Sequence, residues 1–150
     1  MQKLHKREKK GGNGWKIPVF NAVIDTNVFV SGLLSARGNS AQIINAMKEK
    51  QFNLIYNDDI LAEYREVLCR EKLGLYPNDV QELLDVIYRG GLSVISNASD
   101  IPLIDEDDRI FYDTAKTSDA TLVTGNKRHY PNEPFIMSPA DFLNMLNSCD

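Results

Sequence analysis

The fold is decided by residues 19–30, which read VFNAVIDTNVFV. The stretch from Val19 to Ile24 is mainly apolar and rich in β-branched side chains, which is typical of a strand buried on both faces. Asp25, Thr26 and Asn27 follow it directly, and short polar side chains are costly to bury without partners. The stretch therefore predicts a buried strand that ends in a polar turn, followed by a short helix over residues 26–35.

Strands and helices alternate along the remainder of the chain. Short apolar runs predict further strands over residues 52–56, 92–95, 121–124 and 135–137. Helical spacing predicts helices over residues 41–50 and 58–70, capped by Asn39-Ser40 and Asn57-Asp58, and over residues 78–90, 108–118 and from Pro139 on. This alternation predicts an α/β fold, a three-layer α/β/α sandwich with a central parallel sheet. Since such folds bind ligands beyond the carboxyl ends of their strands, the chemistry is expected just after Ile24 and Thr124.

The composition is that of one globular domain. The chain has 150 residues, of which 43% are hydrophobic and 25% charged. No apolar run approaches the roughly 18 residues of a membrane helix, and the basic N-terminus lacks the apolar stretch of a secretory signal. Cys69 and Cys149 have the spacing of neither a zinc site nor a redox pair, so we expect free thiols in the reducing cytoplasm.

Charge is unevenly distributed along the chain. Residues 1–16 hold six basic side chains and one acid, whereas the whole chain carries a net charge of −4. A solvated, disordered arm over residues 1–16, ahead of a folded domain over residues 17–150, is the reading we favour. A dedicated nucleic-acid-binding arm is the alternative.

Asp25 and Glu63 are the first two candidate site residues. Asp25 lies at the expected carboxyl edge of the sheet. It is either a residue of a functional site or only the N-cap of the next helix. Glu63 falls at the rim of an apolar helical stripe and can reach a cleft. A glutamate at such a position usually has no functional role, and the spacing alone favours that interpretation. Glu66 points away from the stripe, and we expect it to pair with Arg70 in solvent.

A run of four acids, Asp105-Glu106-Asp107-Asp108, opens the helix predicted over residues 108–118. The helix dipole favours anions at this position, but one or two acids would satisfy it. Four consecutive acids repel one another, and a bound cation is the simplest compensation. Asp108 is expected to be the helix cap nearest the apolar face and therefore the member that projects into the site.

A polar turn, Thr124-Gly125-Asn126, follows the strand predicted over residues 121–124. Gly125 suits a sharp turn, and Thr124 and Asn126 can hold water, phosphate or a metal ion. Lys127 and Arg128 offer charge for phosphate, and the next residues, His129 and Tyr130, a stacking surface. An ordinary strand-to-loop turn is the alternative, and we expect His129 to be structural.

The motifs are more specific in combination. The blocks VIDTNVFVSGLL, LAEYREVL and DEDDRIFYDTAKTSDATLVTGNKRHY resemble, in order and spacing, the PIN-domain family, and most of all its subgroup of toxins from bacterial toxin–antitoxin pairs. The resemblance runs from about Val19 to Leu146. It implies a cytoplasmic endoribonuclease that hydrolyses RNA phosphodiester bonds with Mg²⁺ or Mn²⁺. It also implies an antitoxin protein as partner and, by analogy, a homodimer.

The same resemblance assigns roles to the acids. The family's first acid corresponds to Asp25, its helix-borne glutamate to Glu63 and its third acid to Asp108, with Asp107 in its place if the register is shifted by one. Asp25 and Asp108 would ligate the metal directly, because hard divalent cations prefer carboxylate oxygens. Glu63 would ligate through water or orient the attacking hydroxide.

The neighbouring polar residues take supporting roles in this interpretation. Thr26 and Asn27 match the small polar pair that follows the first acid of the family, and with Asn126 they would hold the scissile phosphate or the ligand carboxylates. The family often has Asp at the position of Asn126. An amide oxygen can reach a cation but adds no charge, so a second metal would be weak or absent.

Other functions fit the sequence less well. An aspartyl phosphatase needs a second Asp two residues after the first, where Asn27 stands, and a receiver domain needs paired acids where Asn21 and Ala22 stand. A PIN module that binds RNA or a protein partner without cutting remains open, because Asn126 lacks the usual charge.

Overall fold

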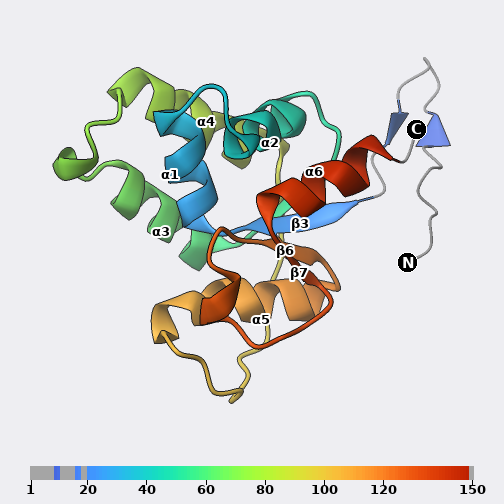
Figure 1. Ribbon diagram of the computed structural model, residues 1–150. Helices are drawn as coiled ribbons and strands as arrows, with labels where there is room; N and C mark the ends of the chain where they lie inside the picture. Colours follow the sequence, from blue (N-terminus) through green and yellow to red (C-terminus); the bar gives the residue numbers. More distant parts are fainter. Residues whose placement is uncertain (1–8, 11–15, 18–19, 149–150) are drawn as a thin grey trace.

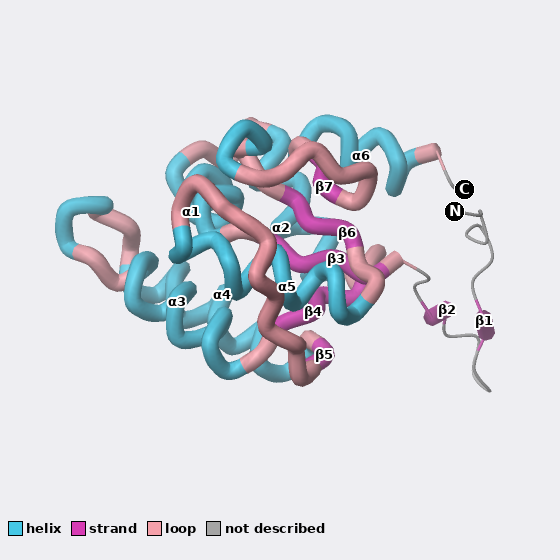
Figure 2. Tube along the Cα trace, turned by 90° about the horizontal axis from the view of Figure 1, so that it is seen from below, coloured by secondary structure: helices cyan, strands magenta, loops and turns pink. Residues whose placement is uncertain are grey.

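The computed structural model describes residues 9–10, 16–17 and 20–148. Its centre is a five-stranded sheet in the order β5-β4-β3-β6-β7, in which every neighbouring pair is parallel. The strands are β3 (Asn21–Ile24), β4 (Asn53–Tyr56), β5 (Leu92–Ser93), β6 (Thr121–Val123) and β7 (Ile136–Met137). The predicted parallel sheet is confirmed, and Figure 2 shows its strands side by side.

Helices cover both faces of this sheet. They are α1 (Thr26–Leu34), α2 (Asn39–Lys48), α3 (Asp58–Leu68), α4 (Pro77–Gly90), α5 (Arg109–Ser118) and α6 (Pro139–Asn147). Figure 1 shows α5 below the sheet and α1, α2 and α6 above it, so the three-layer α/β/α sandwich is confirmed. Short 3₁₀ turns η2 (Glu71–Leu73), η3 (Glu106–Asp108) and η4 (Lys127–His129) join some of these elements.

The topology creates a natural binding position. The central strand β3 is followed along the chain by β4 on one side, while β6 lies on its other side. A crevice forms at the carboxyl ends of strands where the order reverses in this way. Residues Ala22 to Ile24, Leu122 and Val123 are completely buried, which anchors the two strands that border this crevice.

Two predicted helix caps are confirmed, whereas the starts of α2 and α4 differ from the prediction. Asn57 caps α3 by accepting from Ile60 N at 2.9 Å, and Ser138 caps α6 by accepting from Asp141 N at 3.1 Å. The Asn39-Ser40 cap is wrong, because α2 already includes both residues and Gly38 precedes it. The α4 helix begins at Pro77, one residue early, since proline fits the first helical position.

The α1 and α2 helices pack closely because of one glycine. A Cβ at Gly32 would lie 2.6 Å from Ile44 Cδ1 and 3.0 Å from Ser40 O, closer than packed atoms approach. Gly32 therefore lets the end of α1 pack closely against α2.

The basic N-terminal segment is described only in part. Strands β1 (Lys9–Lys10) and β2 (Lys16–Ile17) pair antiparallel, and the rest of the arm predicted over residues 1–16 lies outside the described residues. Cys149 also lies outside them, whereas Cys69 is an exposed free thiol. Within the described part of the chain, no helix has the length and apolarity needed to cross a bilayer.

Candidate functional site

Asp25 is the centre of the candidate site. Its backbone N–H donates to Val123 O at 2.9 Å, which ties the end of β3 to the end of β6. Its side chain is only 6% exposed, and Oδ2 accepts hydrogen bonds from Thr124 Oγ1 and the Tyr130 hydroxyl, each at 2.9 Å. Asp25 is the N-cap residue of α1 and makes no side-chain cap bond, although the backbone N–H groups of Asn27 and Thr26 help to lower the pKa of its carboxyl group.

The polar turn after Asp25 joins the same two strand ends. Asn27 Oδ1 accepts from Gly125 N at 3.0 Å, and Asn27 Nδ2 donates to Thr124 Oγ1 at 3.5 Å. A Cβ at Gly125 would lie 3.3 Å from Asn27 Oδ1, so this glycine serves a close approach and has no left-handed φ. The hydroxyl of Thr26 is buried and makes no hydrogen bond to the described residues.

Asp108, at the start of α5, lies close enough to Asp25 for the two charges to repel each other. Its Oδ2 is buried without a hydrogen-bond partner among the described residues, and His129 Nδ1 lies 3.8 Å away. Asp108 occupies the predicted cap position of α5, but its backbone is helical and its side chain makes no cap bond. Asp105 provides the cap instead by accepting from Asp107 N at 3.0 Å, since η3 extends the helical start by one turn.

The four acids of this run therefore have different roles. Asp105 caps the turn, Glu106 forms an ion pair with Arg109 at 2.7 Å, and Asp107 is exposed to solvent. Asp108 alone places a carboxylate oxygen in a buried position without a hydrogen bond. The sequence predicted this member of the run, at the start of α5, although its side chain does not cap the helix.

Glu63 borders the site from α3. It is half-buried, whereas Glu66 is exposed and pairs with Arg70 at 2.8 Å, as the helical spacing predicts. Burial is the largest cause that raises the pKa of Glu63, followed by repulsion from Glu66 and Asp107; Asp25 contributes as well. The fields of Asp25 and Asp107 therefore reach Glu63 across the crevice.

The other two acids are perturbed in the same direction. Burial raises the pKa of Asp25, while the hydrogen bonds from Tyr130 and Thr124 lower it in part. Burial, followed by the negative charges of Asp25 and Asp105, raises the pKa of Asp108 to about 6. Three carboxylates with raised pKa values at one sheet edge are typical of a functional site, because each charge disfavours the others.

The acids share one edge of the sheet but do not form a closed cage. Among the described residues, no three Asp, Glu, His or Cys side chains lie close enough together to enclose a metal ion. Charged carboxylates repel one another, and only a cation would draw them together. The donor set suits a hard divalent cation that keeps several waters, and Asp108 Oδ2, which accepts no hydrogen bond from the described residues, could ligate it.

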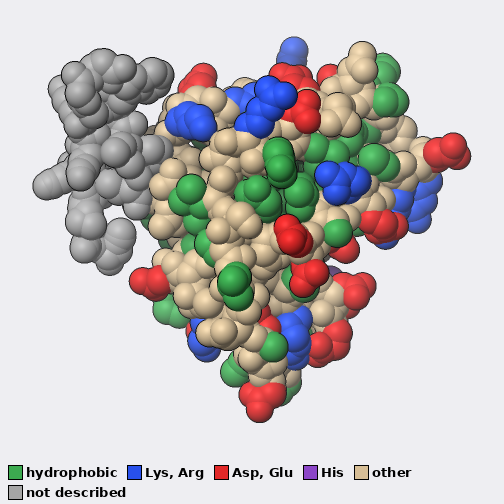
Figure 3. All heavy atoms as spheres, turned by 180° about the vertical axis from the view of Figure 1, so that it is seen from behind, with side chains coloured by type: hydrophobic (Ala, Val, Ile, Leu, Met, Phe, Trp, Pro, Cys, Tyr) green, Lys and Arg blue, Asp and Glu red, His purple; other side chains and the backbone are tan. Residues whose placement is uncertain are grey.

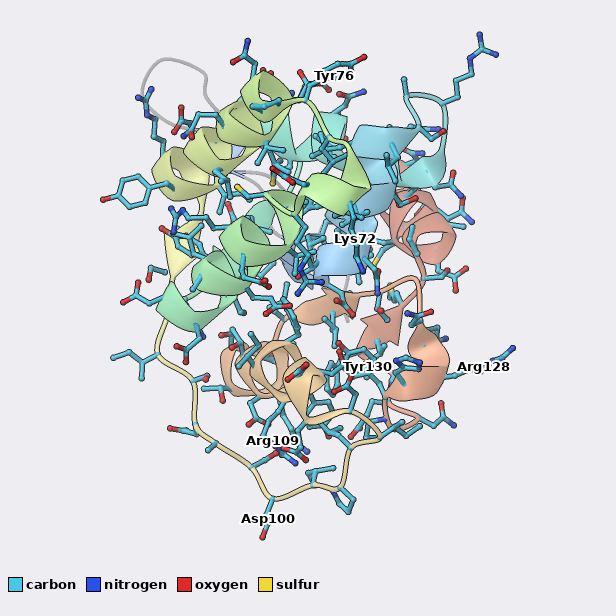
Figure 4. The ribbon with its side chains drawn as sticks, turned by 90° about the vertical axis from the view of Figure 1, so that its left-hand side faces the viewer. Lys72, Tyr76, Asp100, Arg109, Arg128 and Tyr130 are labelled. Carbon is cyan, nitrogen blue, oxygen red and sulfur yellow. The ribbon has the colours of Figure 1, made fainter. Side chains whose placement is uncertain are left out.

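Tyr130 is the residue whose role in the site the sequence did not predict. It was expected to offer a stacking surface, but it is buried and its hydroxyl binds Asp25. Figure 4 shows Tyr130 directed inward, whereas Arg128 extends from η4 into solvent. Burial and the charges of Asp25 and Asp108 raise the pKa of Tyr130 far above its ordinary value, so the hydroxyl keeps its proton and donates. No local sequence pattern predicts the contact between Tyr130 and Asp25, which lie 105 positions apart.

The remaining predicted residues lie on the surface of the turn. Asn126, Lys127 and Arg128 are all exposed beside the buried Thr124. Figure 3, the view from behind Figure 1, shows acidic and basic side chains interspersed with apolar ones. The turn therefore places exposed amide and basic side chains directly after Thr124, which binds Asp25.

Three comparisons relate the chain to known proteins. The family model described as PIN domain matches residues 21–128. An uncharacterized protein of Methanocaldococcus jannaschii is 32% identical over 108 residues, which cover 70% of each chain. The crystal structure of VapBC2 from Rickettsia felis bound to a DNA fragment from their promoter matches 79% of this chain and 97% of that chain.

The last similarity has a TM-score of 0.49 and 16% sequence identity, too distant to speak about the function of this chain. The family match carries more weight, since it covers most of the chain and includes β3, β6 and all three acids. The chain belongs to the PIN-domain family.

Proposed function

We propose that this PIN domain is a metal-dependent endoribonuclease that hydrolyses RNA phosphodiester bonds at Asp25, Glu63 and Asp108. The family is one of nucleases. The observation that supports this site most is the buried Oδ2 of Asp108, which has no hydrogen-bond partner among the described residues and whose carboxylate feels the charge of the buried Asp25. Both acids lie at the point of the sheet where α/β folds bind their ligands.

Mg²⁺ or Mn²⁺ is the cofactor in this proposal, with Asp25 and Asp108 as direct ligands and Glu63 as a ligand through water. A bound ion of this kind lowers the pKa of water and neutralises charge on the phosphate. Thr124 and Tyr130 hold Oδ2 of Asp25 and so fix the orientation of its carboxylate. The raised pKa of Glu63 suits a group that takes a proton from an attacking water.

The polar neighbours support this arrangement in different ways. Asn27 is engaged by Gly125 and Thr124, so we assign it to holding the two strand ends together. Thr26 and Asn126 retain a hydroxyl and an exposed amide for the phosphate, and Lys127 and Arg128 supply exposed charge for the RNA backbone. Asp107, also exposed, takes the role of Asp108 if the register is shifted.

Asn126 bears on the number of metal ions. It brings no charge where the family often has an acid, so one ion rather than two is proposed. The resemblance of the motifs to the toxin subgroup supports a cytoplasmic toxin whose antitoxin covers the acidic crevice, with a homodimer by analogy. Residues 1–16 are proposed to be a basic arm ahead of this nuclease domain.

The test is cleavage of labelled single-stranded RNA with and without Mn²⁺, by wild type and by Asp25→Asn. Cleavage by wild type alone, and only with the ion, would support the nuclease, and the variant excludes a contaminating enzyme. Binding of RNA without cleavage would favour the alternative, a PIN module that binds RNA or a protein partner and does not cut.

A further inference from the structure

A second polar hollow lies beside the acidic site. It has a volume of about 410 Å³ and is bordered by Asn27, Gly125 and Asn126 from the two strand ends. This volume is within the range of roughly 300–1,000 Å³ that is typical of small-ligand sites. None of the residues that line it carries a charge, unlike those of the acidic site. Its position next to Asn27 and Gly125 makes it continuous with the surface where RNA would lie.

The starts of two helices meet at this hollow. Asn39 and Ser40 border it from the first turn of α2, and Ser138 and Ala140 from the start of α6. The first N–H groups of a helix have no partner within the helix, and the helix dipole makes this end positive. Two such ends directed at one hollow form an environment for an anion.

Side chains leave most of these N–H groups free. Gly38 precedes α2 and offers no side chain to cap it, and the first turn of α2 contains no acid. Ser138 accepts only from Asp141 N at the start of α6, which leaves the Ala140 N–H. The hollow therefore presents unsatisfied donors from both helices.

Ser40 points to a ligand independently of the helix geometry. It borders the hollow and is only 8% exposed, yet its hydroxyl makes no hydrogen bond within the described part of the chain. The Ser40 hydroxyl is not among the sealed polar atoms of the described residues, so it keeps some accessible surface and is available to a ligand or water in the hollow. An anion in the hollow would accept from this hydroxyl and from the neighbouring backbone N–H groups.

We infer that this hollow binds a phosphate group of the RNA, next to the one that reaches the acids. The inference rests on the proposed function for the identity of the ligand, because a nucleic acid is the anion that extends from the acidic site. The subsite would hold the strand in register through its backbone, without reading a base.

Asn39→Asp tests the subsite, with Asn45→Asp as its matched control. Both positions are exposed on α2, but Asn45 lies in the second half of the helix, away from the hollow. An acid at the start of α2 is favourable to the helix, so Asn39→Asp should fold at least as stably as wild type. Its carboxylate would nevertheless occupy and repel the anion site.

Two probes are used without divalent metal, inorganic phosphate and labelled single-stranded RNA. We expect phosphate to shift the amide resonances of residues 39–41 and 140 in wild type and Asn45→Asp but not in Asn39→Asp. Loss of one charge-assisted contact should weaken RNA binding about tenfold in Asn39→Asp and leave it within about twofold in the control.

Equal phosphate shifts or equal RNA affinities in the two variants would overturn the inference, as would the absence of shifts in wild type. A cleavage assay with Mn²⁺ separates it from the proposed function. If wild type cuts RNA and the variants bind alike, the subsite is wrong and the nuclease stands. If phosphate binds as expected and no RNA is cut, the anion site stands and the nuclease is wrong.

Discussion

The hydroxyl of Tyr130 donates a hydrogen bond of 2.9 Å to Oδ2 of Asp25, across 105 positions of the sequence. This bond and the one from Thr124 both reach the same carboxylate oxygen, and both partly offset the pKa increase that burial causes in Asp25. Tyr130 is therefore a positioning residue for the acid at the centre of the proposed site.

Tyr130→Phe should lower RNA cleavage about tenfold and weaken the binding of Mn²⁺, because the Asp25 carboxylate loses a donor that favours its charged form. Tyr112→Phe is the control, since the Tyr112 hydroxyl binds Glu133 at 2.5 Å outside the site. Both variants should lose about 1–3 kcal/mol of unfolding free energy. Equal cleavage rates in the two variants would remove the role assigned to Tyr130.

Asp108 should make the stability of the metal-free protein depend on pH. Its pKa rises from 3.8 to about 6 on folding, so the folded state binds the proton more tightly than the unfolded state. Its contribution is therefore present at low pH and is lost as the pH rises from about 4 to about 6. At one pKa unit per 1.36 kcal/mol the loss is at most about 3 kcal/mol, and partial exposure reduces it.

Asp108→Asn mimics the protonated acid and should remove this dependence. Urea unfolding in EDTA between pH 4 and pH 7.5 should show the variant gaining stability relative to wild type across that window and staying constant above it. A difference between variant and wild type that does not change with pH would contradict the pKa assigned to Asp108.

Binding of Mg²⁺ or Mn²⁺ should raise the melting temperature of wild type. An ion at a hundred times its dissociation constant stabilises the fold by about 2.7 kcal/mol, which amounts to several degrees for a domain of this size. Asp25→Asn should lose most of this gain. If metal adds nothing to either protein, and both melt alike without it, there is no carboxylate metal site.

Arg109 should hold the acidic turn in place. It donates to Ser99 O at 2.8 Å and to Ile101 O at 2.7 Å, and it pairs with Glu106. Figure 4 shows it beneath α5, facing the loop that carries Asp100. Arg109→Ala should lower the free energy of unfolding, because it breaks the pair with Glu106 and also leaves two carbonyl oxygens without a donor.

Arg70→Ala is the comparison for that variant. Arg70 forms a similar bidentate pair with Glu66, but on the exposed face of α3. Exposed pairs of this kind contribute little to stability, so urea unfolding should show a clearly larger loss for Arg109→Ala. Similar losses in the two variants would show that Arg109 does not anchor the loop.

Local patterns in the sequence predicted much of the fold. The apolar spacing predicted the five parallel strands and six helices, and Asn57 and Ser138 were recognisable at the starts of α3 and α6. The start of α2 was misplaced because Asn39 and Ser40 are good capping residues that the structure uses inside the helix. Gly38 takes the cap position without a side-chain bond, which no cap preference would favour over them.

Long-range contacts were beyond the reach of these patterns. The bonds of Tyr130 to Asp25 and of Gly125 to Asn27 join residues that lie about a hundred positions apart. Asp113 is another example, since it is buried in α5 only because it accepts hydrogen bonds from Ser99 N and Oγ. The identities of the acids could be proposed from the sequence, but the groups that orient them depend on how the strands assemble.

The most direct test of the proposed acid site is Mn²⁺-dependent cleavage of labelled single-stranded RNA by Asp108→Asn and Asp119→Asn. The two variants remove the same charge from opposite ends of α5, and Asp119 is exposed in a left-handed conformation that Asn tolerates. We predict a loss of about hundredfold or more for Asp108→Asn and a wild-type rate for Asp119→Asn. Equal rates in Asp108→Asn and wild type would contradict the account.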